Sequence, residues 1–180
     1  MKRGLNLFLI ICSQFIMIFY GLAQTSGSKN ISITLPTVVL LDVEPAGTIS
    51  MSFTAPTEAG LPLTNPTPNT TKWLNYTSAV TTGGSRTISA KVSELIPGVD
   101  IKLKASAASG AGGGTRGTPG AEIILTTSST VFISGVGGAF TGTGANNGHQ
   151  LTISLVPNNY ANLLSQTNKQ IQITYTISGT

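Results

Sequence analysis

The feature that most constrains the fold of this chain is strict alternation of apolar and polar residues over short segments. Alternation with a period of two places one set of side chains on each face of an extended strand, whereas an amphipathic helix needs a period near 3.6. No segment of the sequence carries a sustained helical stripe. The alternating segments therefore predict strands of antiparallel sheets; they are residues 31–35, 49–53, 88–92, 101–105, 151–155 and 171–177.

Four shorter or more continuous apolar runs fit buried or edge strands: residues 38–43, 73–76, 123–125 and 131–133. Turn-forming glycine, proline and asparagine separate all of these segments. About 8–10 strands at such spacing predict an all-β fold, an Ig-like antiparallel β-sandwich. A closed barrel uses the same local signals and stays open as an alternative.

The connections between the predicted strands differ in character. Four prolines make residues 55–70 a poor strand and predict a long surface loop. The glycine-rich segment 109–120 lacks the Gly-Lys-Ser/Thr of a phosphate loop and is expected to be a flexible hairpin connection. Residues 135–148 are a second glycine-rich connection, and residues 158–165 predict a single helical turn.

The first 23 residues have the pattern of a secretory signal peptide. Lys2 and Arg3 precede an almost uninterrupted apolar stretch, and Gly21 to Ala23 supply small residues before a cut at Gln24. A membrane anchor is the competing interpretation, but Ser13 and Gln14 interrupt a stretch that is barely long enough to span a bilayer. We therefore expect export, cleavage after residue 23, and one domain over residues 24–180.

Removal of that segment changes the charge and the cysteine content. Ten Lys and Arg residues become eight without Lys2 and Arg3, so eight cations against six Asp and Glu leave a net charge near +2. The remaining cations are scattered singly, which argues against a nucleic-acid surface. Cys12, the single cysteine, lies inside the predicted signal, so no disulfide is expected in the mature chain.

Residues with catalytic chemistry are few. His149 is the only histidine, and a catalytic triad or a zinc site needs a histidine together with a nucleophile or several further ligands. The six acids are dispersed, without the spacing of a calcium loop. We therefore expect no enzyme, no catalytic residue, no cofactor and no metal, although a site assembled from distant acids would leave no local signature.

Two aromatic residues are candidates for contact with carbohydrate. Phe140 lies in a segment rich in glycine and asparagine, where its ring could stack on a sugar or could instead cover the core. Trp73, the only tryptophan, lies in a predicted strand and is expected to belong to the core.

The two ends of the chain carry a family resemblance. Lys29 to Pro36 lead into Val38 to Pro45, and Asn159 and Tyr160 precede a final alternating strand, Gln170 to Ile177. In these segments the chain resembles bacterial fimbrial subunits of the chaperone–usher type and the related spore-coat-protein-U-like secreted domains. The chain departs from the fimbrial pattern in lacking a disulfide and in the position of Tyr175, which is not next to last.

The resemblance implies two roles for these segments. An N-terminal alternating segment would be donated to a neighbouring subunit, with Ile31, Ile33 and Leu35 as the donated residues. The final strand would serve pairing with a chaperone or a partner, through Ile171, Ile173, Tyr175 and Ile177. A physical argument supports donation, because an extended strand offers unpaired backbone groups and alternate side chains to a partner.

The sequence thus predicts a non-enzymatic, secreted or cell-surface structural or adhesive protein, and specifically a fimbria-like subunit. The expected partners are copies of itself or other surface subunits, with polysaccharide as a further possibility and without nucleic acid or a stable membrane span. The alternative is a carbohydrate-binding module with no role in assembly.

Overall fold

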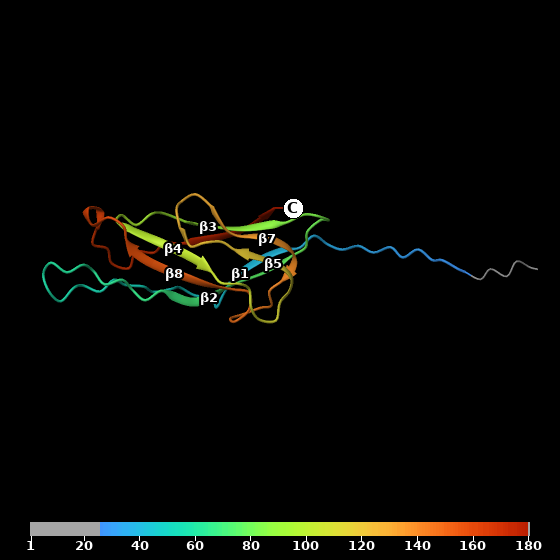
Figure 1. Cartoon of the computed structure of the whole chain (residues 1–180), viewed down its shortest axis with the longest axis horizontal. Coiled ribbons are helices and arrows are strands. Elements are labelled where there is room, and N and C mark those ends of the chain that lie inside the picture. The colour runs from blue at the N-terminus through green and yellow to red at the C-terminus, as the bar shows by residue number, and fades with distance from the viewer. Residues whose placement is uncertain (1–25, 180) are drawn as a thin grey trace, which may run out of the picture. The chain divides into compact units, whose positions relative to one another are not determined.

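The computed structural model describes residues 26–179, and nearly all of their regular structure is β-strand (Figure 1). The predicted signal peptide lies outside these residues. The strands are β1 (Val39–Glu44), β2 (Asn69–Ser78), β3 (Arg86–Val92), β4 (Val99–Ala105), β5 (Gly113–Pro119), β6 (Ile123–Ile124), β7 (Thr130–Phe140), β8 (His149–Pro157) and β9 (Ile173–Gly179). A short 3-10 helix, η2 (Tyr160–Asn162), lies where the helical turn was predicted. The all-β prediction is confirmed, with nine strands against the expected 8–10.

All strand pairs are antiparallel. One layer has the order β1-β2-β8-β4-β6, and the other has the order β9-β3-β7-β5. Strand β7 belongs to both layers, because its early residues pair with β3 while Ala139 and Phe140 pair with β2. It bends between these two parts, where Gly135, Gly137 and Gly138 occur and where the register to β3 and β5 shifts.

The glycine-rich segment 109–120 does not form the expected flexible connection, because most of it is strand β5. A Cβ atom on Gly114 would lie 2.1 Å from the carbonyl oxygen of Gly138, and one on Gly117 would lie 2.7 Å from a methyl group of Val136. Both glycines also have φ near +75–80°, a conformation that side chains disfavour. The glycines are therefore needed for the close approach of β5 to β7, and not for flexibility.

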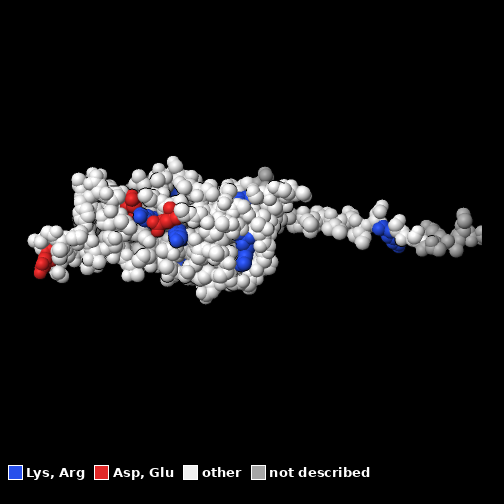
Figure 2. Space-filling view, in the orientation of Figure 1, with Lys and Arg blue, Asp and Glu red and all other residues white. Residues whose placement is uncertain are grey.

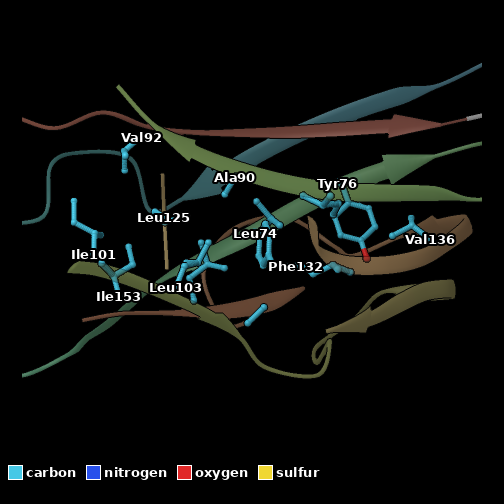
Figure 3. Close-up of a cluster of buried hydrophobic side chains, with 14 of the residues drawn as sticks. Leu74, Tyr76, Ala90, Val92, Ile101, Leu103, Leu125, Phe132, Val136 and Ile153 are labelled. Carbon is cyan, nitrogen blue, oxygen red and sulfur yellow. The ribbon is translucent and has the colours of Figure 1, made fainter. Parts of the chain in front are cut away.

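The core lies between the two layers and follows the predicted alternation (Figure 3). Leu74 and Tyr76 of β2 face Ile88 and Ala90 of β3, and the side chains of β4, β7 and β8 complete the cluster. Each fully buried Leu, Ile, Val or Phe side chain contributes roughly 1.5–3 kcal/mol relative to an exposed one. Trp73, predicted to be a core residue, is only half-buried, because it faces away from this cluster between buried Lys72 and Leu74.

Two segments with strand alternation carry no strand. Residues 49–53 lie against the core through half-buried Ile49 and Met51, but the only pairing nearby is an isolated bridge between Thr54 and Thr64. The bridge joins Thr54, just before the predicted proline-rich loop 55–70, to Thr64 within it, and most of that range is without regular strand before β2 begins at Asn69. The other segment, residues 31–35, is also without regular structure.

The chain divides into two units, with the boundary between Leu35 and Pro36. The second unit, from Pro36 onward, contains all the strands and the core. Of the first unit, residues 26–35 are described, and they contain neither helix nor strand. No helix in the described part of the chain has the length and apolar character needed to cross a bilayer.

Candidate interaction surfaces

The N-terminal row Ile31, Ile33 and Leu35 is almost fully exposed. The three side chains have exposed fractions of 83%, 76% and 86%. Their backbone groups take part in no described strand ladder, so this segment is extended chain with an apolar row and no partner strand among residues 26–179. Exposed alternating apolar rows are unfavourable in water unless a second surface covers them.

The final strand β9 presents a second alternating row. Ile173, Tyr175 and Ile177 are half-buried, while Thr174, Thr176 and Ser178 between them are exposed. Ile171, the fourth residue assigned to this row, lies just before the strand and is also half-buried. The strand pairs on one side with all seven residues of β3, and no described strand pairs with its other side.

Tyr175 of this row packs against an aromatic residue of the core. Its ring lies 6.1 Å from the ring of Phe132, at an interplanar angle of 57°, and burial raises the pKa of its hydroxyl. The tilted arrangement is a favourable one for aromatic pairs. The row on β9 is thus joined to the core through Tyr175 while its outer side stays partly open.

Strand β1 provides a comparable edge in the other layer. Leu41 and Val43 pack against the core but are only half-buried, and β2 is the only described strand that pairs with β1. After β1, the ammonium group of Lys72 donates to the carbonyl oxygens of Pro45 at 2.5 Å and Gly47 at 2.8 Å. Strands β1 and β9 lie close to one another, but no ladder joins them.

The edge row on β1 was missed by the sequence analysis. Residues 38–43 are a nearly continuous apolar run, which fits either a buried or an edge strand and hides the alternation. In the structure Leu40 and Asp42 face outward and are exposed, whereas Leu41 and Val43 face the core. The charged residue Asp42 within this apolar run was the signal that the strand has a solvent face.

His149 lies in a closed polar cluster that was also not predicted. The side chain is fully buried; its Nδ1 donates to the Ser106 carbonyl oxygen at 2.8 Å, and its Nε2 lies 3.0 Å from both the Tyr76 hydroxyl and the Arg116 carbonyl oxygen. The Tyr76 hydroxyl also donates to the Arg116 carbonyl, and the two rings stack at 5.8 Å. The cluster joins β2, β5 and β8, and its burial leaves His149 without access to solvent.

Tyr76 has a shifted pKa in this cluster. Burial raises the pKa of Tyr76 to about 12, and the charge of the Arg116 guanidinium opposes this rise. A tyrosine that keeps its proton can donate a hydrogen bond at any ordinary pH. The cluster therefore acts as an internal connection between the strands.

The acidic side chains do not converge in the described part of the chain. Glu94 pairs with Lys169 at 2.7 Å and Glu122 with Lys102 at 3.5 Å, whereas Asp100 accepts from the side chain of Asn158. Among residues 26–179 no three His, Cys, Asp or Glu side chains lie close enough together to hold a metal ion. Charged groups are also sparse on the face shown in Figure 2.

Phe140 lies on the surface rather than over the core. It is the last residue of β7, its exposed fraction is 52%, and its neighbour Ala139 is the residue that faces the core. This exposed position does not fit the alternative role of covering the core.

Comparisons with protein-family models, with curated proteins and with solved structures found no match.

Proposed function

We propose that this protein is an exported structural subunit, of fimbria-like type, that assembles with copies of itself. In this proposal the N-terminal segment of one copy adds a strand to the open edge of the next. The observation that carries it is that one chain contains both an exposed alternating apolar segment and two neighbouring half-buried edge strands.

The two surfaces match in length and spacing. Ile31, Ile33 and Leu35 span five residues, as do Ile173, Tyr175 and Ile177 on β9. Side chains on one face of a strand repeat about every 6.6–6.8 Å in both cases, so three apolar residues of the donor can meet three on the acceptor. An added strand would also satisfy backbone groups along the outer side of β9.

The polarity of the two surfaces favours the same arrangement. The donor segment carries polar Asn30 before its apolar row and Ser32 and Thr34 within it, and β9 carries Thr174, Thr176 and Ser178. If the apolar rows face the core of the acceptor, both polar rows face water. This is the pattern of neighbouring strands in an antiparallel sheet with one solvated face.

The connectivity favours an open chain of subunits rather than a closed pair. A contact between a donor on one copy and a different acceptor surface on the next is heterologous, and it propagates unless rotation closes a ring. Mutual exchange between two copies is the alternative geometry of the same contact. Electron microscopy of the assembled protein distinguishes filaments from dimers.

The test is assembly of the exported protein, measured by light scattering over a range of concentrations. We expect the wild-type protein to form concentration-dependent assemblies and the double variant Ile31→Asp/Ile33→Asp to remain a folded monomer. The matched control is Ser32→Asp/Thr34→Asp, which places the same two charges on the polar row and should still assemble. A wild-type protein that stays monomeric, or an aspartate variant that assembles normally, would contradict the proposal.

A further inference from the structure

A second surface lies on the outward face of the sheet, away from the half-buried rows of the two edge strands, and runs across the end of four neighbouring strands. Leu40 of β1 lies opposite Thr77 of β2, Thr77 opposite Phe140 of β7, and Phe140 opposite Gly113 of β5. Residues that lie directly opposite each other in a sheet point to the same face. We call Leu40, Thr77, Phe140 and Gly113 the Phe140 strip.

The strip is open to solvent. Leu40 has an exposed fraction of 65% and Phe140 one of 52%, and Thr77 is exposed. Two large apolar side chains on either side of a threonine therefore face outward on a sheet surface. Their burial would be favourable, because each leaves apolar area in contact with water.

Glycine at position 113 leaves room for the Phe140 ring, because it has no Cβ atom. A Cβ atom on Gly113 would lie 3.2 Å from Cε1 and 3.5 Å from Cζ of Phe140, so the ring lies directly over the backbone of β5. One part of the ring is supported by this backbone, and the rest faces solvent. The result is an aromatic surface held by the sheet rather than by a mobile loop.

The chemistry of the strip favours an uncharged ligand. None of its four residues is charged, and the mature chain carries few charged residues overall. An anion or a nucleic acid would need cations that the strip lacks. The Thr77 hydroxyl is both a donor and an acceptor, and Thr77 lies directly opposite Phe140 in the sheet.

The size of the strip favours a small binding unit. A stable protein–protein interface buries about 800 Å² on each partner, from some 20–30 residues. Four residues are too few for such an interface, but they suffice for a single ring with an apolar face and hydroxyl groups at its edge.

We propose that the Phe140 strip binds a sugar ring of a neutral polysaccharide. The C–H face of one sugar would lie on Phe140, its hydroxyl groups would bond with Thr77, and Leu40, two strands from Phe140, would contact the adjoining sugar. The strip faces outward at the sheet surface, so it would accept a short stretch of a long chain without enclosing it. This activity is independent of strand donation, because it uses neither Ile31 to Leu35 nor the row on β9.

Binding is tested by titrating the labelled exported protein with cello-, xylo-, laminari- and chito-oligosaccharides and following backbone amide shifts by NMR. We expect at least one of these neutral series to bind and to shift the amides of the strip. Phe140→Ala should weaken that binding on the order of tenfold, the scale for removing one aromatic anchor. Phe140→Trp should retain it.

The control is Val131→Ala, because Val131 is an equally exposed apolar residue at the other end of β7. This variant should bind as the wild type does. If Phe140→Ala does not fold, as judged by circular dichroism, Leu40→Ala takes its place and should weaken binding severalfold.

Three results would overturn the inference: no shift with any neutral series, binding that Phe140→Ala leaves intact, or preference for an anionic chain such as an oligogalacturonate. Light scattering on the same variants measures assembly independently of sugar binding, so the two proposals can fail separately. Phe140→Ala should assemble normally, and Ile31→Asp/Ile33→Asp should still bind sugar.

Discussion

Residues 31–35 and 151–155 have almost the same pattern, Ile-Ser-Ile-Thr-Leu and Leu-Thr-Ile-Ser-Leu, yet they differ completely in burial. In β8, Leu151 and Ile153 have exposed fractions of 0% and 4%, whereas Ile31 and Ile33 have 83% and 76%. Strand β8 lies between β2 and β4, which supply ladders on both sides and a layer beneath. Residues 31–35 have no such neighbours within the described chain.

Alternation therefore indicates which face of a strand is apolar, but neighbouring strands determine whether that face is buried. Strand β9 is the intermediate case, because it has one paired side and a half-buried row. Truncating an apolar side chain should therefore lower the free energy of unfolding most in β8 and less in β9. In residues 31–35 of the isolated monomer, the same change should have an effect close to zero.

The largest effect is expected for Leu151→Ala in β8. Leu151 is fully buried, and its truncation removes transfer free energy and leaves a cavity, so the free energy of unfolding should fall by about 2–5 kcal/mol. Urea denaturation followed by circular dichroism measures the change. A loss below 1 kcal/mol would show that the core around β8 collapses to fill the space.

An intermediate effect is expected for Ile177→Ala in β9. Ile177 lies opposite Ile88, which is fully buried, so the two form a matched pair of the same residue type. In the monomer, Ile88→Ala should cost about 2–5 kcal/mol and Ile177→Ala less, since part of the Ile177 surface is already exposed. Equal costs for the two variants would argue against an open edge at β9.

A smaller effect, confined to alkaline solution, is expected from the buried tyrosines. The pKa of Tyr76 is raised to about 12, and that of Tyr175 is raised by burial, against a value near 10 in the unfolded chain. Between pH 10 and 12 the unfolded tyrosines lose protons that the folded ones keep, so stability falls as pH rises through this range and does not depend on these groups below pH 9. Melting curves of wild type and Tyr76→Phe between pH 8 and 12 test this, and the variant should show the shallower decline.

Most of the fold was predictable from the sequence, because the core strands carry local signals. The alternation in 88–92, 101–105 and 151–155 correctly identified strands β3, β4 and β8. Strand β5 could not be identified, because its pairing depends on glycines that allow contact with β7, and glycine in an isolated segment is typical of a loop. The prediction for residues 49–53 was wrong in the opposite sense: these residues alternate as a strand would, but they form no strand ladder.

The interaction surfaces were predictable only in part. Ile31, Ile33 and Leu35 and the row on β9 are visible as alternating residues, and Phe140 stands out as an aromatic residue among glycines. The roles of Leu41, Val43, Leu40 and Thr77 depend on strand order and register, which join residues far apart in the sequence. The cluster of His149 with Tyr76 depends on the same long-range pairing.

The smallest effect on folding is expected for Ile33→Ser, and it tests the comparison most directly. Ile33 lies in the exposed segment, with an exposed fraction of 76%, so the free energy of unfolding of the monomer should change by less than about 0.5 kcal/mol. The matched variant Ile153→Ser makes the same substitution in the same alternation, but it removes a buried side chain and places a hydroxyl group in the core, at a cost of several kcal/mol. Urea denaturation at a concentration where the wild type is monomeric measures both. If Ile33→Ser destabilises the monomer as strongly as Ile153→Ser, residues 31–35 belong to the fold of their own subunit, and strand donation to a second copy would have to be abandoned.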